Sequence, residues 1–394
     1  MKDKHINIET DSAILKQLHA AVHDQLQLNR FSTAALLFLK FIFYFSAVLF
    51  CYYSIFIATQ FAFVLLSYIG FGLLSVLLGF NFAHDFSHNT IFKNKKLNNY
   101  CYTFLYTLVG ADAESWKFRH IHSHHYAPNV KDYDSDLQIT NLIRVEPGSA
   151  RKWFHKYQHW YASLAYTTYS LYWVFIKDFV IYFKDQQYSK KKNVAHHLSF
   201  WVQKIIYITL LIILPLVFTA HHWYYIVIAF ILMHLVQSLF LLFTFFITHH
   251  VEKTEYFSAD VEGYIKTSWI NNQVKSSNDF YPFSHAANFI FGGFNNHIAH
   301  HLFPHINHLH YPKLNTIIYP ILRSHQIAPN VTGFFSGIIS HLKHLKTMGK
   351  KQCNRNCSNC TLAKKHFKSS SLSSFPTNTS TSSAHESTPI NAFH

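Results

Sequence analysis

Two long stretches without a charged residue constrain the fold of this chain more than any other feature. Residues 41–83 and residues 205–251 contain no Asp, Glu, Lys or Arg. An apolar helix needs only about 20 residues to cross the roughly 30 Å hydrocarbon core of a bilayer. Each stretch is about twice that length, and a backbone in lipid must satisfy its own hydrogen bonds. Each stretch therefore predicts two transmembrane helices joined by a turn.

The distribution of basic residues predicts the orientation of these helices. The formal net charge of +15 at pH 7 would by itself permit a nucleic-acid partner. However, the expected turns near residues 53–54 and 221–222 carry no Lys or Arg, which instead gather in the C-terminal region and between the two stretches (Lys93, Lys95, Lys96, Lys117, Arg119, Arg151, Lys152, Lys190, Lys191, Lys192). By the positive-inside rule, both termini and the central segment are expected in the cytoplasm. We expect a membrane-lipid environment and no nucleic acid.

Composition divides the chain into three parts. Residues 1–30 are expected to be a cytoplasmic lead without a secretory signal, with a helix capped by Asp11. Residues 31–348 are expected to form an all-α integral membrane domain. It would have four transmembrane helices in two hairpins (about 32–83 and 201–248) and a cytoplasmic helical cap (84–200 and 249–348). Within the cap, residues 98–110 are too short to span, and residues 160–183 suit an interfacial helix rich in aromatic side chains.

The third part, residues 349–394, is expected to be a disordered tail rich in Cys, Ser and Thr. Cys353, Cys357 and Cys360 lie close together in it. These cysteines lack an obvious fourth metal ligand, which favours a solvated or lipid-modified segment over a metal or redox site.

Histidine is unusually frequent, with 31 residues in 394. At this frequency, any fixed three-histidine pattern arises by chance roughly 0.2 times in the chain, so one such pattern is weak evidence. Three patterns occur in order, all in the segments expected in the cytoplasm. They are His84-x3-His88, His120-x3-His124-His125 and His297-x2-His300-His301, and His249 lies where the second charge-free stretch ends.

The spacing within these patterns predicts metal ligation. Imidazoles three or four residues apart lie on one face of a helix and are expected to share a metal. Neighbours such as His124 and His125 diverge by about 100° and suit two adjacent metals. Nine imidazoles are too many for one ion and fit two ions with open positions for oxygen.

The expected location of these ligands favours iron over the other metals that imidazole binds, which include zinc, copper and nickel. The patterns lie at the ends of apolar helices, where a lipid-like substrate can arrive from the bilayer. Breaking an unactivated C–H bond there requires activated oxygen, which redox-inert zinc does not generate.

Other histidines have less specific interpretations. His221 and His222 are expected at the opposite membrane face, His234 inside the helix bundle, and His196 and His197 on a loop surface. Solvated or supporting positions are expected for His122, His305, His308 and His310.

The three patterns and their flanks resemble the membrane fatty-acid desaturase family, with its HDxxH, HxxxHH and (H/Q)xxHH boxes. The flanking matches are Trp116-x3-His120, Asp134-x-Asp136, Gly292-Gly293-Phe294-Asn295, Leu302-Phe303-Pro304 and His308-x-His310-Tyr311-Pro312. The resemblance spans about residues 35–330 and is closest to the bacterial linoleoyl-type and front-end subgroup. That subgroup often has Gln where this chain has His297. No His-Pro-Gly-Gly haem motif is present, so a fused cytochrome b5 domain is not expected.

The resemblance implies a di-iron centre held by nine ligands (His84, His88, His120, His124, His125, His249, His297, His300, His301). It suggests Asp85, Asp134 and Asp136 as residues that orient the ligand imidazoles. Glu252, one helical turn after His249, is expected to do the same. Trp269, Gln273 and Asn278 match family positions and are expected at the substrate.

The implied activity is desaturation of a fatty-acyl lipid or acyl-CoA, with O2 as co-substrate. Because O2 leaves as water, two electrons must come from an external donor of the ferredoxin or cytochrome b5 type. Hydroxylation or ketolation of a lipid or carotenoid is the alternative, since related histidine-box proteins share the metal site. A membrane metal transporter is a third interpretation, which predicts ligands within the spans, facing a pathway.

Overall fold

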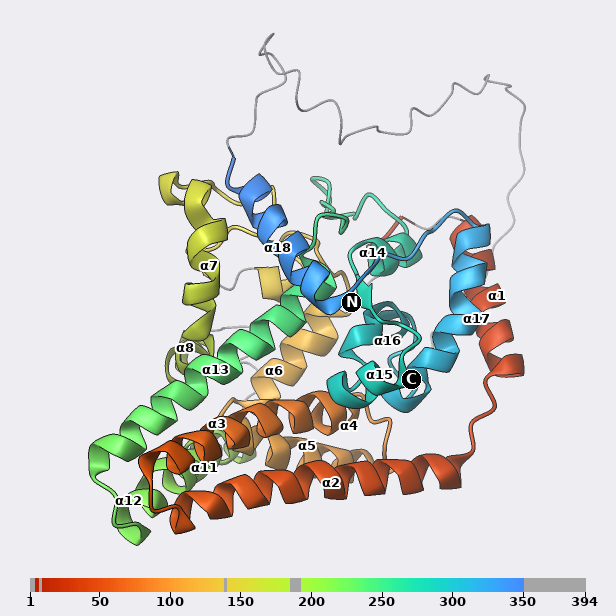
Figure 1. The fold of residues 1–394 in the computed structure, drawn as a ribbon. Coiled ribbons are helices and arrows are strands. Elements are labelled where there is room, and N and C mark those ends of the chain that lie inside the picture. Colours follow the sequence, from red (N-terminus) through yellow and green to blue (C-terminus); the bar gives the residue numbers. More distant parts are fainter. Residues whose placement is uncertain (1–3, 7–8, 138–139, 185–192, 351–394) are drawn as a thin grey trace, which may run out of the picture. The chain divides into compact units, whose positions relative to one another are not determined.

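The computed structural model describes residues 4–6, 9–137, 140–184 and 193–350. The expected tail (349–394), with its three cysteines, lies almost wholly outside the described residues. Residues 1–350 form one unit that is mostly helical (Figure 1). Its only described strands, β1 (Asp279–Phe280) and β2 (Val331–Thr332), pair in parallel.

Four helical segments in the described part of the chain are long and apolar enough to cross a membrane: Arg30–Ile57, Phe61–Ser87, Val194–Phe218 and Trp223–His249. The first is α2 (Arg30–Ile57). The second joins α3 (Phe61–Leu78), the π-helical turn η1 (Gly79–Ala83) and α4 (His84–Ser87). The third joins α11 (Val194–Ile208), η6 (Thr209–Ile213) and α12 (Leu214–Phe218), and the fourth is α13 (Trp223–His249). This agrees with the predicted all-α membrane protein.

Both turns between these helices differ only slightly from the predicted positions. The first lies at residues 58–60, a few residues later than expected, and the second lies at residues 219–222. The two turns meet, because the carbonyl of Ala58 accepts a hydrogen bond from His221 at 2.7 Å. In Figure 1 they lie at the lower left, at the far end of α2 and α13 from α16.

The third span begins earlier than the charge-free stretch because its one buried lysine is paired. Lys204 Nζ lies 2.6 Å from Asp178 Oδ2 and donates to the carbonyls of Gly110 and Val174. The aspartate opens α9 (Asp178–Lys184). A buried lysine is tolerated where a carboxylate and further acceptors compensate it.

The segment expected to lie at the interface is a nearly continuous helical run outside the four candidate spans. It comprises η4 (Trp153–Tyr157), α7 (Gln158–Thr167), α8 (Tyr169–Tyr172), the π-helical turn η5 (Trp173–Lys177) and α9. Trp153, Trp160 and Leu164 are each about three-quarters exposed. Such a band of exposed aromatic and aliphatic side chains is typical of a membrane interface.

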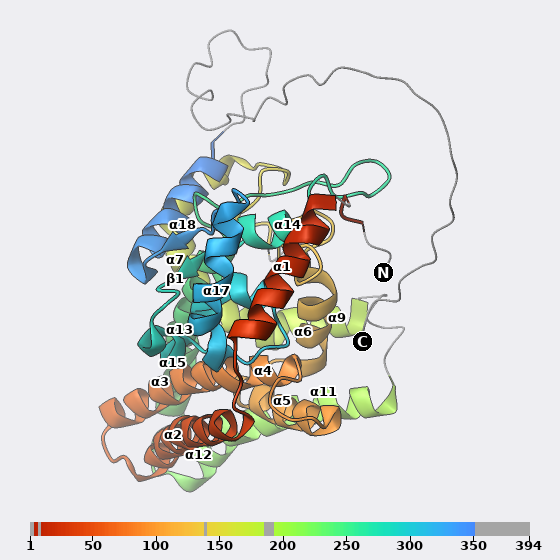
Figure 2. The same cartoon turned by 90° about the vertical axis from the view of Figure 1, so that its right-hand side faces the viewer.

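The N-terminal helix α1 (Glu9–Gln25) packs against α17 (Tyr311–Ser324), as both ribbon views show (Figure 2). It begins two residues before Asp11, so Asp11 does not cap it as predicted. Instead, the Asp11 carboxylate accepts the backbone N–H of Ile270 at the start of α14 (Trp269–Lys275), at 3.4 Å. Similarly, His196 is buried in α11 beside Glu114, at 2.7 Å, and not on a loop surface.

Two glycines bring the third histidine pattern against the first. Gly292 and Gly293 follow α15 (His285–Phe291) with positive φ values of 59° and 86°, which favour glycine. A Cβ on Gly292 would lie 2.5 Å from the carbonyl oxygen of Phe80 in η1. Asn81 of the same π-helical turn donates to the carbonyl of Ile290 at 3.0 Å. The turn before His297 therefore packs directly on the turn before His84.

Candidate metal centre

All nine predicted ligand histidines converge into two adjoining groups. In each group the potential ligand atoms lie within 4.8 Å of one another. The first group is His84, His88, His120, His125 and His300, and the second is His124, His249, His297 and His301. His88 and His125 are partly buried and the other seven are buried.

The second pattern serves both groups because its backbone is a π-helical turn, η2 (His120–His124), which follows α6 (Ala113–Arg119). The N–H of His125 donates to the carbonyl of His120, five residues earlier, at 2.9 Å. In a π-turn residues i and i+5 come together. His120 therefore shares a group with His125, and the expected sharing between His120 and His124 is wrong.

The third pattern also serves both groups, from the short helix α16 (His297–Leu302). His297 and His301, four residues apart, lie in the second group, as predicted. His300 lies in the first group, so the expected sharing between His297 and His300, three residues apart, is wrong. His84 and His88, also four apart, share the first group, as predicted. His249 is the last residue of α13 and belongs to the second group.

The convergence of ring nitrogens fits metal ions better than hydrogen bonds. His120 Nε2 lies 3.1 Å from His84 Nε2, 3.2 Å from His88 Nε2 and 3.1 Å from His125 Nε2. One N–H can serve only one of these neighbours well. In the second group, Nε2 of His124 and of His301 are buried without a partner among the described residues. Four or five nitrogen atoms facing one point are what an imidazole-bound metal requires.

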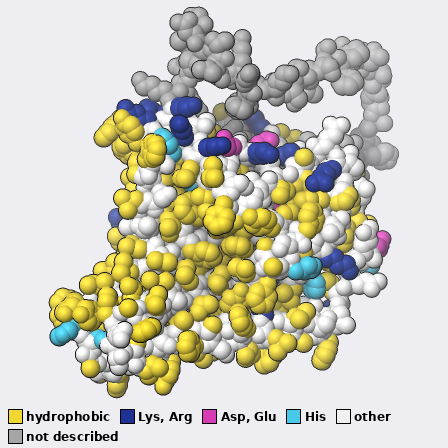
Figure 3. Space-filling view, in the orientation of Figure 1, with side chains coloured by type: hydrophobic (Ala, Val, Ile, Leu, Met, Phe, Trp, Pro, Cys, Tyr) yellow, Lys and Arg dark blue, Asp and Glu magenta, His cyan; other side chains and the backbone are white. Residues whose placement is uncertain are grey.

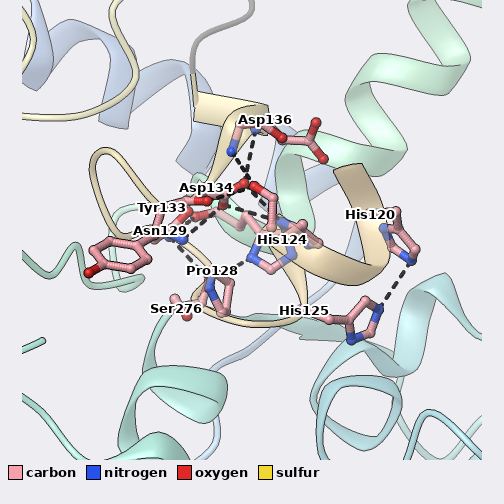
Figure 4. A network of polar contacts seen from close by, with 12 residues as sticks. His120, His124, His125, Pro128, Asn129, Tyr133, Asp134, Asp136 and Ser276 are labelled. Carbon is pink, nitrogen blue, oxygen red and sulfur yellow. Dashed lines mark hydrogen bonds and ion pairs between the residues drawn. The ribbon is translucent and has the colours of Figure 1, made fainter. Parts of the chain in front are cut away.

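Asp134 fixes the orientation of His124 (Figure 4). Its oxygens lie 3.2 and 3.3 Å from His124 Nδ1, which leaves Nε2 to face the second group. Each oxygen also accepts a backbone N–H, from Asn129 at 3.0 Å and from Asp136 at 2.9 Å. A carboxylate held in this way behind an imidazole sets its tautomer and its ring plane. His124, Asp134 and Asp136 also form a compact group that could hold an ion, but the His124–Asp134 hydrogen bond accounts for their proximity.

Backbone and amide oxygens perform the same role for other ligands. The carbonyl of Ser276 lies 2.9 Å from His249 Nδ1, and Gln273 Oε1 lies 2.8 Å from His301 Nδ1. Asn129 links these parts, because its Nδ2 donates to the carbonyls of His249 and Ser276. These contacts keep the Nδ1 hydrogen atoms engaged and direct the Nε2 lone pairs inward.

Three of the predicted supporting residues make different contacts from those expected. Asp85 binds His308, at 2.7 Å, and Asn307, and neither is a member of the two groups. His308 in turn contacts Lys40 Nζ at 2.9 Å. Asp136 faces Arg119 at 3.4 Å, and Glu252 is exposed and accepts from the hydroxyl of Ser340.

The electrostatics of the groups favour neutral imidazoles, which are the metal-binding form. Burial, together with Lys117, lowers the pKa of His88 to about 3. Burial and neighbouring imidazoles lower the pKa of several other members well below the ordinary value (His120, His125, His297, His300, His301). His124 differs, because Asp134 and Asp136 more than offset the effect of burial and raise its pKa.

A pocket with mostly apolar walls adjoins the first group. His84 lines it together with Trp116, whose ring stacks on His120 at a centroid distance of 4.3 Å and an angle of 18°. Trp269, Gln273 and Asn278, which were expected at the substrate, do not line it. Asn278 is fully buried and bonds to Ile247 and Thr332, and Trp269 packs near α1.

A sequence profile described as "Fatty acid desaturase" matches residues 58–333. The chain belongs to the fatty acid desaturase family. The match covers both groups of histidines and all five of the flanking motifs named above.

Relatives in the family support the predicted subgroup. The chain is 29% identical over 286 residues to an acyl-lipid (8-3)-desaturase of Physcomitrium patens, covering 71% of this chain and 59% of the relative. It is 29% identical to an sn-1 linoleoyl-lipid 6-desaturase of Arthrospira platensis, covering 60% and 64%, and 25% identical to one of Synechocystis, covering 69% and 76%. The chain thus spans about three-fifths of the length of the first two relatives. The predicted family and its likeness to bacterial linoleoyl-type desaturases are confirmed.

The sequence patterns identified the nine histidines but missed several residues around them. Gln273 was assigned to the substrate although it contacts His301. Ser276 contributes a backbone carbonyl, which no side-chain motif can reveal. Arg119 and Trp173, which line the pocket, were also missed. Only their positions in the sequence could have suggested them, because Arg119 directly precedes the second histidine pattern and Trp173 lies in the aromatic segment 160–183.

Proposed function

We propose that this protein is an oxygen-dependent fatty-acyl desaturase with two iron ions held by the nine histidines. The observation that carries this proposal is the pair of adjoining imidazole groups beside an apolar pocket. Iron bound there would supply the oxidant for removing two vicinal hydrogens from an acyl chain, with one O2, two electrons and two protons consumed and two waters formed. The names of the relatives, which are acyl-lipid and linoleoyl-lipid desaturases, agree with an acyl substrate.

The chain's own residues would orient the ligand imidazoles and shield the alkyl chain from water. Asp134, Ser276 and Gln273 contact Nδ1 of three of these histidines, so that their Nε2 atoms would be free to hold the metals. Gln273 is therefore proposed as an orienting residue and not as a substrate contact. The apolar walls of the pocket would exclude water from an alkyl chain lying beside His84, where water would compete for the oxidant.

The proposed topology places the histidine groups on the cytoplasmic side, with both turns between spans on the other side. On the face shown in Figure 3, Lys and Arg gather toward the top and right, while the lower part is mostly hydrophobic. This distribution supports a membrane-embedded lower part and two transmembrane hairpins. A basic cytoplasmic surface would attract an acidic electron donor of the ferredoxin or cytochrome b5 type.

Expression in a host of defined fatty-acid composition tests the function. We expect new double bonds in the lipid acyl chains, located by mass spectrometry, and none with a His301→Ala variant produced at the same level. Hydroxy or keto products would support the alternative activity of the same metal centre. Unchanged lipids with an iron-loaded protein and a suitable reductant would contradict the proposed reaction.

A further inference from the structure

The pocket beside the first histidine group has one polar corner. Most of its wall is aliphatic or aromatic and comes from α3, α5 (Lys95–Val109) and α13. The exceptions lie together where α6 ends and include Arg119 and Asp136, whose side chains approach to 3.4 Å. An amphiphile with a long apolar part suits such a pocket.

Two N–H groups in this pocket are buried without a hydrogen-bond partner among the described residues. They are Nε of Arg119 and the indole Nε1 of Trp173. The side chain of Arg119 is 11% exposed and Trp173 is 8% exposed, so bulk water does not serve them well. Buried donors are nearly always paired in folded proteins. Two unpaired donors lining one pocket indicate a ligand with an oxygen acceptor.

Both donors line the same pocket as His84 of the first histidine group. Arg119 is the last residue of α6, directly before His120. Trp173 is the first residue of the π-helical turn η5, and such turns are frequent at functional sites. Trp116, three residues before Arg119, lines the same pocket and stacks on His120. A ligand held at the polar corner therefore extends past the first histidine group.

The charges around the corner favour a neutral acceptor over an anion. Arg119 faces Asp136 at 3.4 Å, and Lys204 faces Asp178 at 2.6 Å. Burial and the Arg119 charge lower the pKa of Lys177, the third cation beside these carboxylates, to about 7, so it contributes little fixed positive charge. A free carboxylate would meet the Asp136 carboxylate in the same corner, where like charges repel. The carbonyl oxygen of an ester or thioester accepts hydrogen bonds without that repulsion.

We propose that Arg119 Nε–H and Trp173 Nε1–H bind the carbonyl oxygen of an esterified acyl chain, so that its alkyl part lies along the apolar wall past His84. This inference rests on the proposed desaturase function and assigns it a carbonyl-anchored substrate. A fixed carbonyl places one particular carbon beside the metals, so the position of the double bond is counted from the carboxyl end.

A comparison of ester-linked and ether-linked substrates tests the anchor. The full-length enzyme in nanodiscs is assayed for binding and turnover of a glycerolipid and of its ether analogue, which differs only in lacking the carbonyl. We expect wild type to prefer the ester by about tenfold or more, since one of the two hydrogen bonds comes from a charged group. Matched acyl-CoA and free fatty acid show whether an ester, a thioester or a carboxylate is the bound form.

Three variants separate the anchor from general stability. Trp173→Phe removes one N–H and keeps the ring, and is expected to reduce the ester preference about fivefold. Arg119→Met combined with Asp136→Asn removes the second donor without leaving a carboxylate unpaired, and should abolish the preference and scatter the double-bond position. Trp160→Phe, on the exposed face of α7, is the matched control and should behave like wild type.

The outcomes distinguish this inference from the proposed function. If wild type desaturates but both pocket variants keep its ester preference and double-bond position, the carbonyl anchor is wrong and the desaturase function stands. A stronger preference for the free acid over the ester would also overturn the anchor. If wild type forms no double bond in any lipid, the proposed function fails, whereas the binding comparison still reports on the two donors.

Discussion

Replacing Asp134 by asparagine removes one charge behind His124 while keeping the shape of the side chain. In the structure both carboxylate oxygens lie within 3.3 Å of His124 Nδ1, and each accepts a backbone N–H. An amide has only one oxygen, so its NH2 group must face the N–H of either Asn129 or Asp136. The variant therefore loses the charge and also one of the hydrogen bonds that hold the loop after η2.

The expected loss is large enough to measure as metal affinity. Partners behind metal-bound imidazoles contribute about 10- to 100-fold in affinity or activity. Although burial lowers the pKa of His124, the charge and hydrogen bond of Asp134, with help from Asp136, raise it above its ordinary value. In wild type a proton therefore competes with metal at His124 as the pH falls. Without the Asp134 charge this pKa falls, so the midpoint of metal binding moves to lower pH while the affinity at high pH decreases.

The measurement is the metal content of the full-length protein in nanodiscs after dialysis against graded chelator, between about pH 6 and about pH 8, where histidine titrates. Asp260→Asn is the matched control. The carboxylate of Asp260 also accepts two backbone N–H groups, from Glu262 at 3.0 Å and Tyr264 at 2.8 Å, but contacts no ligand imidazole. An Asp134→Asn protein with wild-type affinity and midpoint would refute the role assigned to the carboxylate, as would an equal loss in the control.

Four further outcomes are expected. His125→Ala should abolish metal loading and product, because its Nε2 faces His120 and His300 at 3.1 and 2.8 Å. His222 is exposed at the far turn, so His222→Ala should keep most activity. An equal loss of activity in the two variants would contradict the assignment of His125 as a ligand. Lys204→Met should lower the free energy of unfolding by about 3–5 kcal/mol, because it leaves Asp178 buried and unpaired. The measurement is the thermal midpoint. Adding Asp178→Asn should restore most of the lost stability, and no recovery would argue against a stabilising Lys204–Asp178 pair. Single cysteines near residues 90 and 280 should label from the same membrane side, and opposite labelling would rule out one shared site. Turnover with an acidic ferredoxin should fall as the salt concentration rises beyond about 0.1 M. A rate independent of salt would contradict docking of the donor on a basic surface.

Histidine spacing predicted part of the grouping of the ligands. His84 and His88 share a group, and the adjacent His300 and His301 of α16 separate, as a rotation of about 100° per residue requires. The prediction fails for His297 and His300, which are three residues apart in α16 but lie in different groups. It also fails at His120, because the π-helical turn adds a residue to the local period. Such a turn depends on packing at the site, which the periodicity of one segment does not contain.

The partners behind the imidazoles were harder to predict because they depend on where helices end. Glu252 would lie one turn beyond His249 if α13 continued, but His250 leaves the helix with φ −127° and ψ 58°. The carbonyl of Ser276 takes the place that a carboxylate was expected to occupy. The start of the third membrane helix was mispredicted for a similar reason. Lys204 bounds the charge-free stretch in the sequence, but in the fold it pairs with Asp178, so the helix can begin before it.

Two short segments, the turn η2 and the helix α16, set the spacing between the two histidine groups, and the long membrane helices do not. The turn η2 contributes to both, through His120 on one side and His124 on the other, and α16 does the same through His300 and His301. The long helices each serve only one group, α3–α4 the first through His84 and α13 the second through His249. A change of tilt in one membrane helix would therefore alter one histidine group, while the spacing between the two groups depends on η2 and α16. The residues that hold these two segments are Asp134 behind η2 and the glycine pair before α16, so small substitutions there should disturb both histidine groups at once.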